Sequence, residues 1–425
     1  MTPSISFPRT YAPDGIYFRH LVVSPDYSIH RGGAILAKWS APSVPILKVQ
    51  STSDDSSLPC VGFDRSVPWV ELPYPAIDVA WCPFKEGDGY ASFLTACNSS
   101  PLQLWDMEDA SLRASYCCTN DAGMPACPHS ILWSSHRSLV AAGYGGNEDK
   151  THVRFYDILQ EGTTVQSSYK SPCSKGLVSA LCDGPAPYQE NLVLAGFIRS
   201  GNVDIIDTRH CGAAAVLRGL RSGVAQIMVH PVSEYLVYAA GRLGDKRIVC
   251  WDIRKSTRLL TAFERELRTQ QPAMFGFIQR KGVGTQSVNL VTATHDNGVL
   301  VFEGNTVTNT TNTTTTTNNN NTVSSSYSSA SHSSEPRRIK AELGSTSGLT
   351  ILDSNGTIAV TVGERQYYVK DKYESNTGSP QMTERRAKRS RSPLEDHDLP
   401  SDNECEEKQM NAGSIVVFSE WCLRL

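Results

Sequence analysis

The sequence predicts an all-β protein in which seven four-stranded blades close into a ring. A short apolar run that ends in Trp-Asp and continues with an apolar residue and Arg occurs at residues 247–258 (RIVCWDIRKSTR). Its copies LQLWDM, VRFYDI, VDIIDT and VLVFEG place the residue equivalent to Trp251 at 105, 156, 206 and 302, so that the steps are 45 to 51 residues long. This period is typical of one blade of a WD-repeat β-propeller, which takes roughly 40–50 residues.

Two weaker copies bring the count to seven. AILAKWS (residues 34–40) precedes the series and SIVVFSEW (residues 414–421) follows it, and we interpret both as the Trp-Asp strand of a blade. A strand is also predicted over residues 16–23. Because the N-terminal strand of such rings often completes the last blade, this segment is a candidate for closing the circle.

Blades two to five each show four predicted strands. In blade two these are IDVAWCPF, ASFLTAC, LQLWDM and LRASY. The corresponding segments are ILWSS, SLVAAGY, VRFYDI and TVQSSY in blade three, LVSALCD, NLVLAGF, VDIIDT and AAVLRGL in blade four, and VAQIMVHP, YLVYAAG, IVCWDI and RLLTAF in blade five. Blade six shows only three, namely MFGFIQ, VNLVTATH and VLVFEG.

The pattern is interrupted twice near the C-terminus. Thr, Asn and Ser make up 25 of the 30 residues from 305 to 334, and such a composition cannot bury a core. A second polar stretch lies between the strands of blade seven. We therefore expect a flexible arm at 1–16, blades one to six at 17–304, a disordered insert at 305–346, the start of blade seven at 347–370, a disordered basic and acidic insert at 371–411, and the closing strand at 412–425.

The overall composition restricts the function. A formal net charge of −3 excludes a global nucleic-acid footprint, so that any RNA contact must come from a local patch. No stretch of 18 apolar residues is present, and the N-terminus has no apolar signal core, so we expect neither a membrane partner nor secretion. The 12 cysteines contain no CxxC pair, and we expect buried reduced thiols rather than a metal site.

Motifs that carry catalysis are missing from the sequence. There is no GxxxxGKS/T phosphate loop, no GxSxG nucleophile elbow and no HExxH zinc motif, and the ten histidines show no ligand spacing. We therefore expect a non-enzymatic binding protein without a metal or another cofactor.

In such a ring, the turns that lead into the third strands lie on one face, together with the connections between blades. Basic residues collect there, and the segment RELRTQQ (residues 265–271) adds amide side chains. A positive patch of this kind would bind phosphates, while the amides would read exposed base edges. The alternative is an ordinary surface of mixed charge, since acidic residues are interspersed. The candidate RNA-binding residues are Arg199, Arg218, Arg221, Arg242, Lys246, Arg247, Gln270 and Gln271.

The second insert contains the basic run ERRAKRSRSP (residues 384–393). Such runs are recognised by nuclear import receptors, although a solvated tail with no targeting role is the alternative. Ser392 precedes Pro393 and is a candidate phosphorylation site, whose phosphate would offset the nearby positive charge. The candidate targeting residues are Arg385, Arg386, Lys388, Arg389 and Arg391.

Three segments resemble the WD-repeat telomerase Cajal body protein family. In blade two, IDVAWCPF and FLTACNSSPLQLWDMEDASLRASY are similar to the family's pattern of a Trp-x-Pro strand, a Trp-Asp strand and an Arg-Ala-Ser-Tyr strand. Residues 224–271 share an inner strand that ends in His-Pro and a Cys-Trp-Asp-Ile-Arg strand. The last blade resembles the family's ending at residues 363–366, Trp421 and Cys422.

This resemblance implies a nuclear propeller that binds the CAB-box loop of small Cajal-body RNAs and of telomerase RNA, and that promotes localisation and assembly of their ribonucleoproteins. A fungal branch of the family is linked to pre-mRNA splicing instead. The expected partners are a small nuclear or Cajal-body RNA with its ribonucleoprotein and a nuclear import receptor, and we expect a monomer. The alternatives are a splicing factor and a protein-only WD-repeat adaptor.

Overall fold

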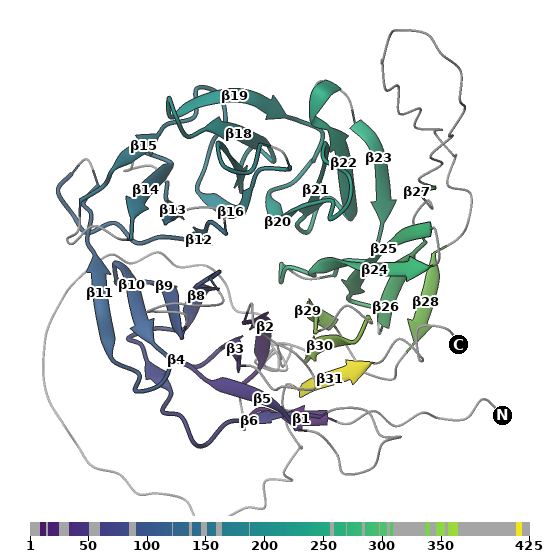
Figure 1. The fold of residues 1–425 in the computed structure, drawn as a ribbon, viewed down its shortest axis with the longest axis horizontal. Coiled ribbons are helices and arrows are strands. Elements are labelled where there is room, and N and C mark those ends of the chain that lie inside the picture. The colour runs from purple at the N-terminus through teal and green to yellow at the C-terminus, as the bar shows by residue number, and fades with distance from the viewer. Residues whose placement is uncertain are drawn as a thin grey trace, which may run out of the picture. The chain divides into compact units, whose positions relative to one another are not determined.

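The protein is an all-β, seven-bladed propeller, as the sequence predicts (Figure 1). The computed structural model describes residues 9–13, 16–24, 34–50, 60–84, 91–120, 122–135, 138–145, 151–158, 164–186, 188–255, 259–268, 270–282, 285–296, 298–303, 307–308, 336–340, 346–352, 356–363 and 414–418. The seven sheets belong to one compact unit, Met1–Glu364 with Ala412–Leu425. In blades one to six, the first strand in the sequence lies nearest the centre of the ring. No helix within the described ranges has the length and hydrophobicity to span a membrane.

Blades two to five contain the four strands predicted for each of them. Their strands follow the order of the sequence from the inside of the ring outward, and each pairs antiparallel with the next. Blade two consists of β8 (Ala76–Trp81), β9 (Ser92–Cys97), β10 (Leu102–Asp106) and β11 (Leu112–Tyr116), and blade three of β12 (Ser130–Trp133), β13 (Leu139–Gly143), β14 (Val153–Asp157) and β15 (Ser167–Tyr169). Blade four consists of β16 (Val178–Asp183), β17 (Leu192–Phe197), β18 (Val203–Asp207) and β19 (Gly212–Leu217). Blade five consists of β20 (Val224–Val229), β21 (Leu236–Gly241), β22 (Arg247–Asp252) and β23 (Leu259–Glu264), with the short 3-10 helix η1 (Ile253–Lys255) after β22.

Blade one differs from the prediction in the position of AILAKWS among its four strands. It consists of β2 (Phe18–Val23), β3 (Ala34–Trp39), β5 (Ile46–Gln50) and β6 (Cys60–Phe63). AILAKWS is therefore the second strand and not the Trp-Asp strand. Trp39 is fully buried, and its indole N–H donates to the carbonyl oxygen of Ser43 (3.0 Å), at the strand β4 (Ser43–Val44) that pairs with β7 (Val70–Glu71). The aromatic residue alone thus does not identify the strand.

Blade six has a fourth strand that the sequence did not reveal. It consists of β24 (Phe275–Gly282), β25 (Thr285–Thr294), β26 (Gly298–Phe302) and β28 (Arg337–Lys340), while β27 (Val307–Thr308) pairs with β25. The assignment of residues 305–346 to a disordered insert is wrong for β27, β28 and Thr346. The sequence does not predict β28, because RRIK resembles a solvent-exposed basic cluster. Its backbone nevertheless pairs with β26, since this pairing does not depend on the charge of the side chains.

Blade seven is closed by the N-terminus. Its strands are β29 (Thr346–Ile351), β30 (Ile358–Val362), β31 (Ser414–Phe418) and β1 (Arg9–Tyr11), and Thr10 lies opposite Ile415. Part of the expected flexible arm is thus the outer strand of the last blade, and β2, the candidate closing strand, is instead the inner strand of blade one. A three-residue strand has no periodicity that a sequence could reveal.

Side chains on the inner strands link neighbouring blades by hydrogen bonds to the backbone. Ser130 donates to the carbonyl of Val178 (2.9 Å), and Ser179 donates to that of Val224 (2.7 Å). The Gln226 amide pairs with the backbone of Phe275 in both directions, at 3.0 and 2.8 Å. Thr350 of blade seven donates to the carbonyl of Leu21 of blade one (2.6 Å), which ties the last blade to the first.

The hydrophobic core lies between adjacent blades. Trp251, for example, is fully buried with Ile227, Val237 and Val249 between blades four and five. Its indole N–H donates to the carbonyl oxygen of Arg218 (2.9 Å), so that a buried polar group is satisfied by the loop before blade five. The Trp-Asp motif therefore holds the connecting loop in position, and this Trp is a core residue.

Candidate nucleic-acid interface

One face of the ring, called here the turn face, is built from two kinds of segment. They are the turns between second and third strands and the connections from one blade to the next. Backbone hydrogen bonds join them: Arg242 N donates to the Gly223 carbonyl (3.0 Å), Arg265 N to that of Lys246 (3.0 Å), and His295 N to that of Glu266 (3.0 Å). The turns of blades five and six therefore lie next to the connections that lead into these two blades.

Three of the predicted site residues are exposed cations on this face. Arg199 lies in the turn of blade four, and Arg218 and Arg221 lie in the loop that leads to blade five. None of the three forms an ion pair with a carboxylate of a described residue. The loop is fixed beneath them, because the carbonyl of Arg218 accepts the Trp251 bond and Arg221 N donates to Asp245 Oδ2 (2.6 Å).

Arg247 has a structural role instead. Its guanidinium makes a two-pronged ion pair with Asp245, at 2.7 Å (Nε–Oδ1) and 2.8 Å (Nη2–Oδ2), and also donates to the Gly219 carbonyl (2.9 Å). Although burial opposes it, hydrogen bonds from Arg247 and from Arg221 N lower the pKa of the Asp245 carboxyl. Arg247 is therefore committed to holding the turn in place, and reversal of its charge would disturb the fold as well as any ligand.

Arg242 is half-buried in the same turn. Its carbonyl oxygen accepts from Ser222 Oγ (2.9 Å) and from Asp245 N (2.9 Å), which fixes the turn against the loop. Burial lowers the pKa of its guanidinium, and its Nε has no hydrogen-bond partner among the described residues. Arg242 thus differs from the exposed cations around it in that its charge is partly desolvated.

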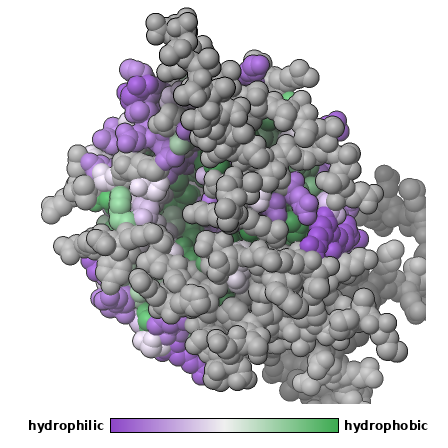
Figure 2. Space-filling model, turned by 45° about the vertical axis from the view of Figure 1, so that its right-hand side comes forward, coloured by the Kyte–Doolittle hydropathy of each residue, from purple (hydrophilic) through white to green (hydrophobic). Residues whose placement is uncertain are grey.

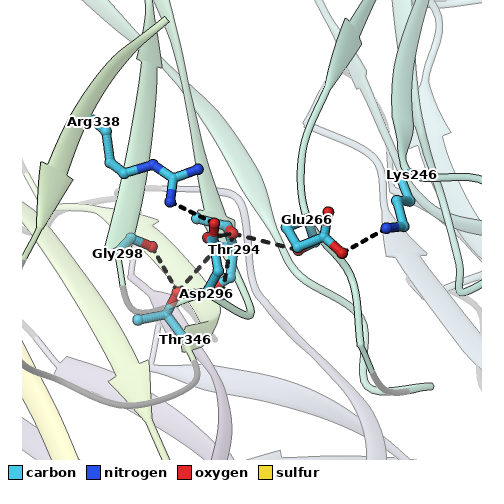
Figure 3. A network of polar contacts seen from close by, with 7 residues as sticks. All are labelled: Lys246, Glu266, Thr294, Asp296, Gly298, Arg338 and Thr346. Carbon is cyan, nitrogen blue, oxygen red and sulfur yellow. Dashed lines mark hydrogen bonds and ion pairs between the residues drawn. The ribbon is translucent and has the colours of Figure 1, made fainter.

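Lys246 belongs to a polar network that crosses from blade five to blade seven (Figure 3). Its ammonium pairs with Glu266 Oε1 (2.5 Å), and the Glu266 carbonyl accepts from Thr294 Oγ1 (3.3 Å). Thr294 Oγ1 also bonds to Asp296, whose other carboxylate oxygen pairs with Arg338 of β28 (2.5 Å). The buried Thr346 hydroxyl donates to the carbonyls of Thr294 (2.7 Å) and Gly298 (2.8 Å).

The glutamines of the RELRTQQ segment are placed differently from each other. Gln270 is exposed and Gln271 is half-buried, with polar contacts of its own. Two exposed basic residues extend the patch beyond the predicted set: Arg268, beside Gln270, and Lys175, whose backbone exchanges hydrogen bonds with Ser200 in the turn of blade four. Lys175 could have been found from its place in the connection before blade four.

A buried network supports the patch at blade four. Asp204 is fully buried and accepts from Tyr169 Oη (2.7 Å) and from Ser174 Oγ (2.5 Å), while Asn202 donates to Ser174 Oγ (3.1 Å). Burial, followed by the bond to Asp204, raises the pKa of the Tyr169 phenol. The connection before blade four is thereby fastened to the third strand, and Lys175 is positioned at its end.

Among the described residues, no group of three or more His, Cys, Asp or Glu side chains could hold a metal ion. In the view of Figure 2, hydrophilic residues lie at the surface and hydrophobic ones are seen mainly in recesses between them.

The candidate targeting residues and Ser392 lie outside the described residues.

Fold and repeat together define a seven-bladed WD-repeat propeller protein with a basic turn face. Over 184 residues the chain is 24% identical to "Telomerase Cajal body protein 1" of Rattus norvegicus, Mus musculus and Homo sapiens, which confirms the resemblance at the level of the family. The match covers 43% of this chain and spans about a third (32%) of the length of these curated relatives. No protein-family profile matches the chain.

Proposed function

We propose that this protein is a non-enzymatic, RNA-binding propeller of small nuclear ribonucleoproteins. Its RNA would be of the Cajal-body class, telomerase RNA included, and its role would be the localisation and assembly of the particle. The names of its relatives, which refer to telomerase and to Cajal bodies, support the choice of particle.

The observation that carries the proposal is the set of exposed cations that no described carboxylate neutralises. Arg199, Arg218 and Arg221 come from two adjacent segments of the turn face, and Lys175 and Arg268 extend them on either side. Basic side chains fixed on a rigid ring bind phosphates at positions set by the fold. A ring surface of this kind suits an unpaired loop, whose phosphates and bases are both accessible.

In this mechanism the cations bind the phosphates and the amides read the bases. Gln270 is exposed beside Arg268 and presents both a donor and an acceptor, as required to bind the edge of an unpaired base. Trp251 takes no part in stacking, since it is fully buried. The basic run at residues 384–393 would supply nuclear import, through an import receptor, and the protein would act as a monomer.

The test is crosslinking of the full-length protein to RNA in cells, followed by immunoprecipitation and sequencing. The variant is Arg218→Gln with Arg221→Gln. Its matched control is Arg209→Gln with Lys255→Gln, which removes the same charge from the other end of β18 and β22, where both side chains are exposed. We expect small nuclear and Cajal-body RNAs with the wild type and the control, and a loss of about tenfold with the variant.

Other outcomes are equally informative. Enrichment of spliceosomal RNA would move the assignment to pre-mRNA splicing. Wild-type protein that crosslinks to no RNA above background would overturn the proposal and favour a protein-only adaptor.

A further inference from the structure

The part of the turn face between blades five and six contains cations that no described residue neutralises, although two of them are not on the surface. Arg265 is 3% exposed, and Arg242 is half-buried. Charges removed from water are normally paired, because the desolvation of an unpaired ion costs a large share of the stability of a domain. The arrangement around these two arginines therefore needs an explanation.

Among the described residues, the hydrogen-bond partners of Arg265 are all neutral. Its Nη1 donates to the Ala273 carbonyl (2.5 Å) and to Thr292 Oγ1 (2.8 Å), and its Nη2 donates to the Gly241 carbonyl (3.3 Å). Its Nε has no hydrogen-bond partner among the described residues. Burial lowers the pKa of this guanidinium to about 9, so that it still carries its charge at neutral pH.

Three carboxylates of this region are already paired, and a fourth, Glu264, is exposed at the end of β23, opposite Arg247. Asp245 pairs with Arg247, Glu266 with Lys246, and Asp296 with Arg338. Arg242, Arg265 and the exposed Arg268 are left over, and the carbonyl that Arg265 Nη2 binds belongs to Gly241, the residue next to Arg242. Arg268 joins the group through its backbone N–H, which donates to Nδ1 of the buried His295 (2.9 Å).

We propose that Arg242 and Arg265, with Arg268 at the rim, form a recessed site for one phosphate group between blades five and six. The inference rests on the proposed function, since in the complex this phosphate is a phosphodiester of the bound RNA. The unpartnered Nε atoms supply donors, and the uncompensated charges supply the attraction. The exposed cations of blades four and five would then guide the RNA, while the recessed pair would fix its register.

The first experiment measures the melting temperature of the full chain with millimolar inorganic pyrophosphate, against sodium chloride at equal ionic strength. Low concentrations are needed because concentrated phosphate salts stabilise proteins without binding a site. We expect a concentration-dependent rise for the wild type and for Lys255→Gln, and loss of at least half of it for Arg242→Gln. Arg242→Gln keeps the backbone bonds of the turn, and Arg268→Gln is a second, exposed variant whose folding is not in question.

The second experiment measures the affinity for a mixed-sequence, single-stranded RNA oligonucleotide. Arg242→Gln and Arg268→Gln should each weaken it by about tenfold, as expected for a charge-assisted hydrogen bond. An equal pyrophosphate shift in wild type and Arg242→Gln, no shift at all, or unchanged RNA affinity in both variants would overturn the recessed site. If Arg218→Gln with Arg221→Gln still weakens RNA binding in that case, the proposed function stands; if the wild type binds no RNA, the function fails whatever pyrophosphate does.

Discussion

The two ends of strands β18 and β22 carry similar residues in opposite arrangements. At the end away from the turn face, Asp207 pairs with Arg209 (2.7 Å) and Asp252 with Arg254 (2.6 Å), each within its own turn. At the turn face, Arg199, Arg218 and Arg221 have no such partner among the described residues. A chain with a net charge of −3 can therefore present a positive patch, because Arg199, Arg218 and Arg221 keep their charge while Arg209 and Arg254 are neutralised by adjacent carboxylates.

Burial separates the two ends as well. Asp245 at the turn face has a side chain that is 2% exposed, whereas that of Asp207 is 17% exposed and its partner Arg209 is 61% exposed. Exposed pairs contribute little to stability, while removal of one partner from a buried pair is costly. Asp245 at the turn face therefore maintains the fold, whereas Asp207 at the other end mainly neutralises the charge of Arg209.

The largest effect is expected from removal of the buried carboxylate. Asp245→Ala should lower the free energy of unfolding by about 2 to 3 kcal/mol, because Arg247 and the N–H of Arg221 lose their partner. Asp207→Ala should have little effect. Urea unfolding of both variants checks this, and equal losses would show that the two ends do not differ.

A smaller loss is expected at the other buried carboxylate of the turn face. Tyr169→Phe removes the hydroxyl that donates to Asp204 (2.7 Å), and we expect a cost of about 1 to 3 kcal/mol. Tyr188→Phe is the matched control, since its ring is 46% exposed. If both variants unfold at the same urea concentration, the Asp204 network does not hold the loop before blade four.

Acid should act on the other end of the ring through His230, in the turn between β20 and β21. Burial lowers the pKa of His230 to about 4, whereas in the unfolded chain it is about 6.5. Between these two values the unfolded state binds more protons than the folded state. The stability that depends on neutral His230 is therefore fully present above about pH 6.5 and is lost as the pH falls to about 4. His230→Gln should show a shallower decline of the urea midpoint over this range, and an unchanged slope would contradict the assignment.

The smallest change in stability is expected at the exposed ion pair of Figure 3. Lys246→Gln should cost less than about 1 kcal/mol, because Lys246 is 51% and Glu266 38% exposed. Thermal unfolding of Lys246→Gln and Glu266→Gln measures it. A loss as large as that of Asp245→Ala would mean that this pair, too, is part of the structural framework.

The sequence predicted the parts of the fold that have a period. Blades two to five follow from their third strands, which have five or six residues and carry the aromatic or apolar repeat. The outer strands of blades six and seven could not be predicted, because β28 is a basic RRIK segment beyond a low-complexity stretch and β1 has three residues. Their pairing is decided by the free edge of the preceding strand, which is a tertiary effect.

Prediction of the site had a similar limit. Position on the turn face follows from the repeat, and Arg199, Arg218 and Arg221 are exposed there. What each arginine binds does not follow from it. Arg242 and Arg247 are five residues apart in one turn, yet the first has an unpartnered Nε and the second is fully engaged by Asp245.

The salt dependence of RNA binding tests the central claim most directly. The affinity of the full chain for a single-stranded RNA oligonucleotide would be measured over a range of sodium chloride concentrations. Each phosphate contact contributes about 0.7 to the slope of log K against log salt, so Arg218→Gln with Arg221→Gln should reduce the slope by about 1.4. Arg209→Gln with Lys255→Gln should leave it unchanged. Equal slopes for the two double variants would contradict the account, because the unpaired cations of the turn face would then be no different from the rest of the surface.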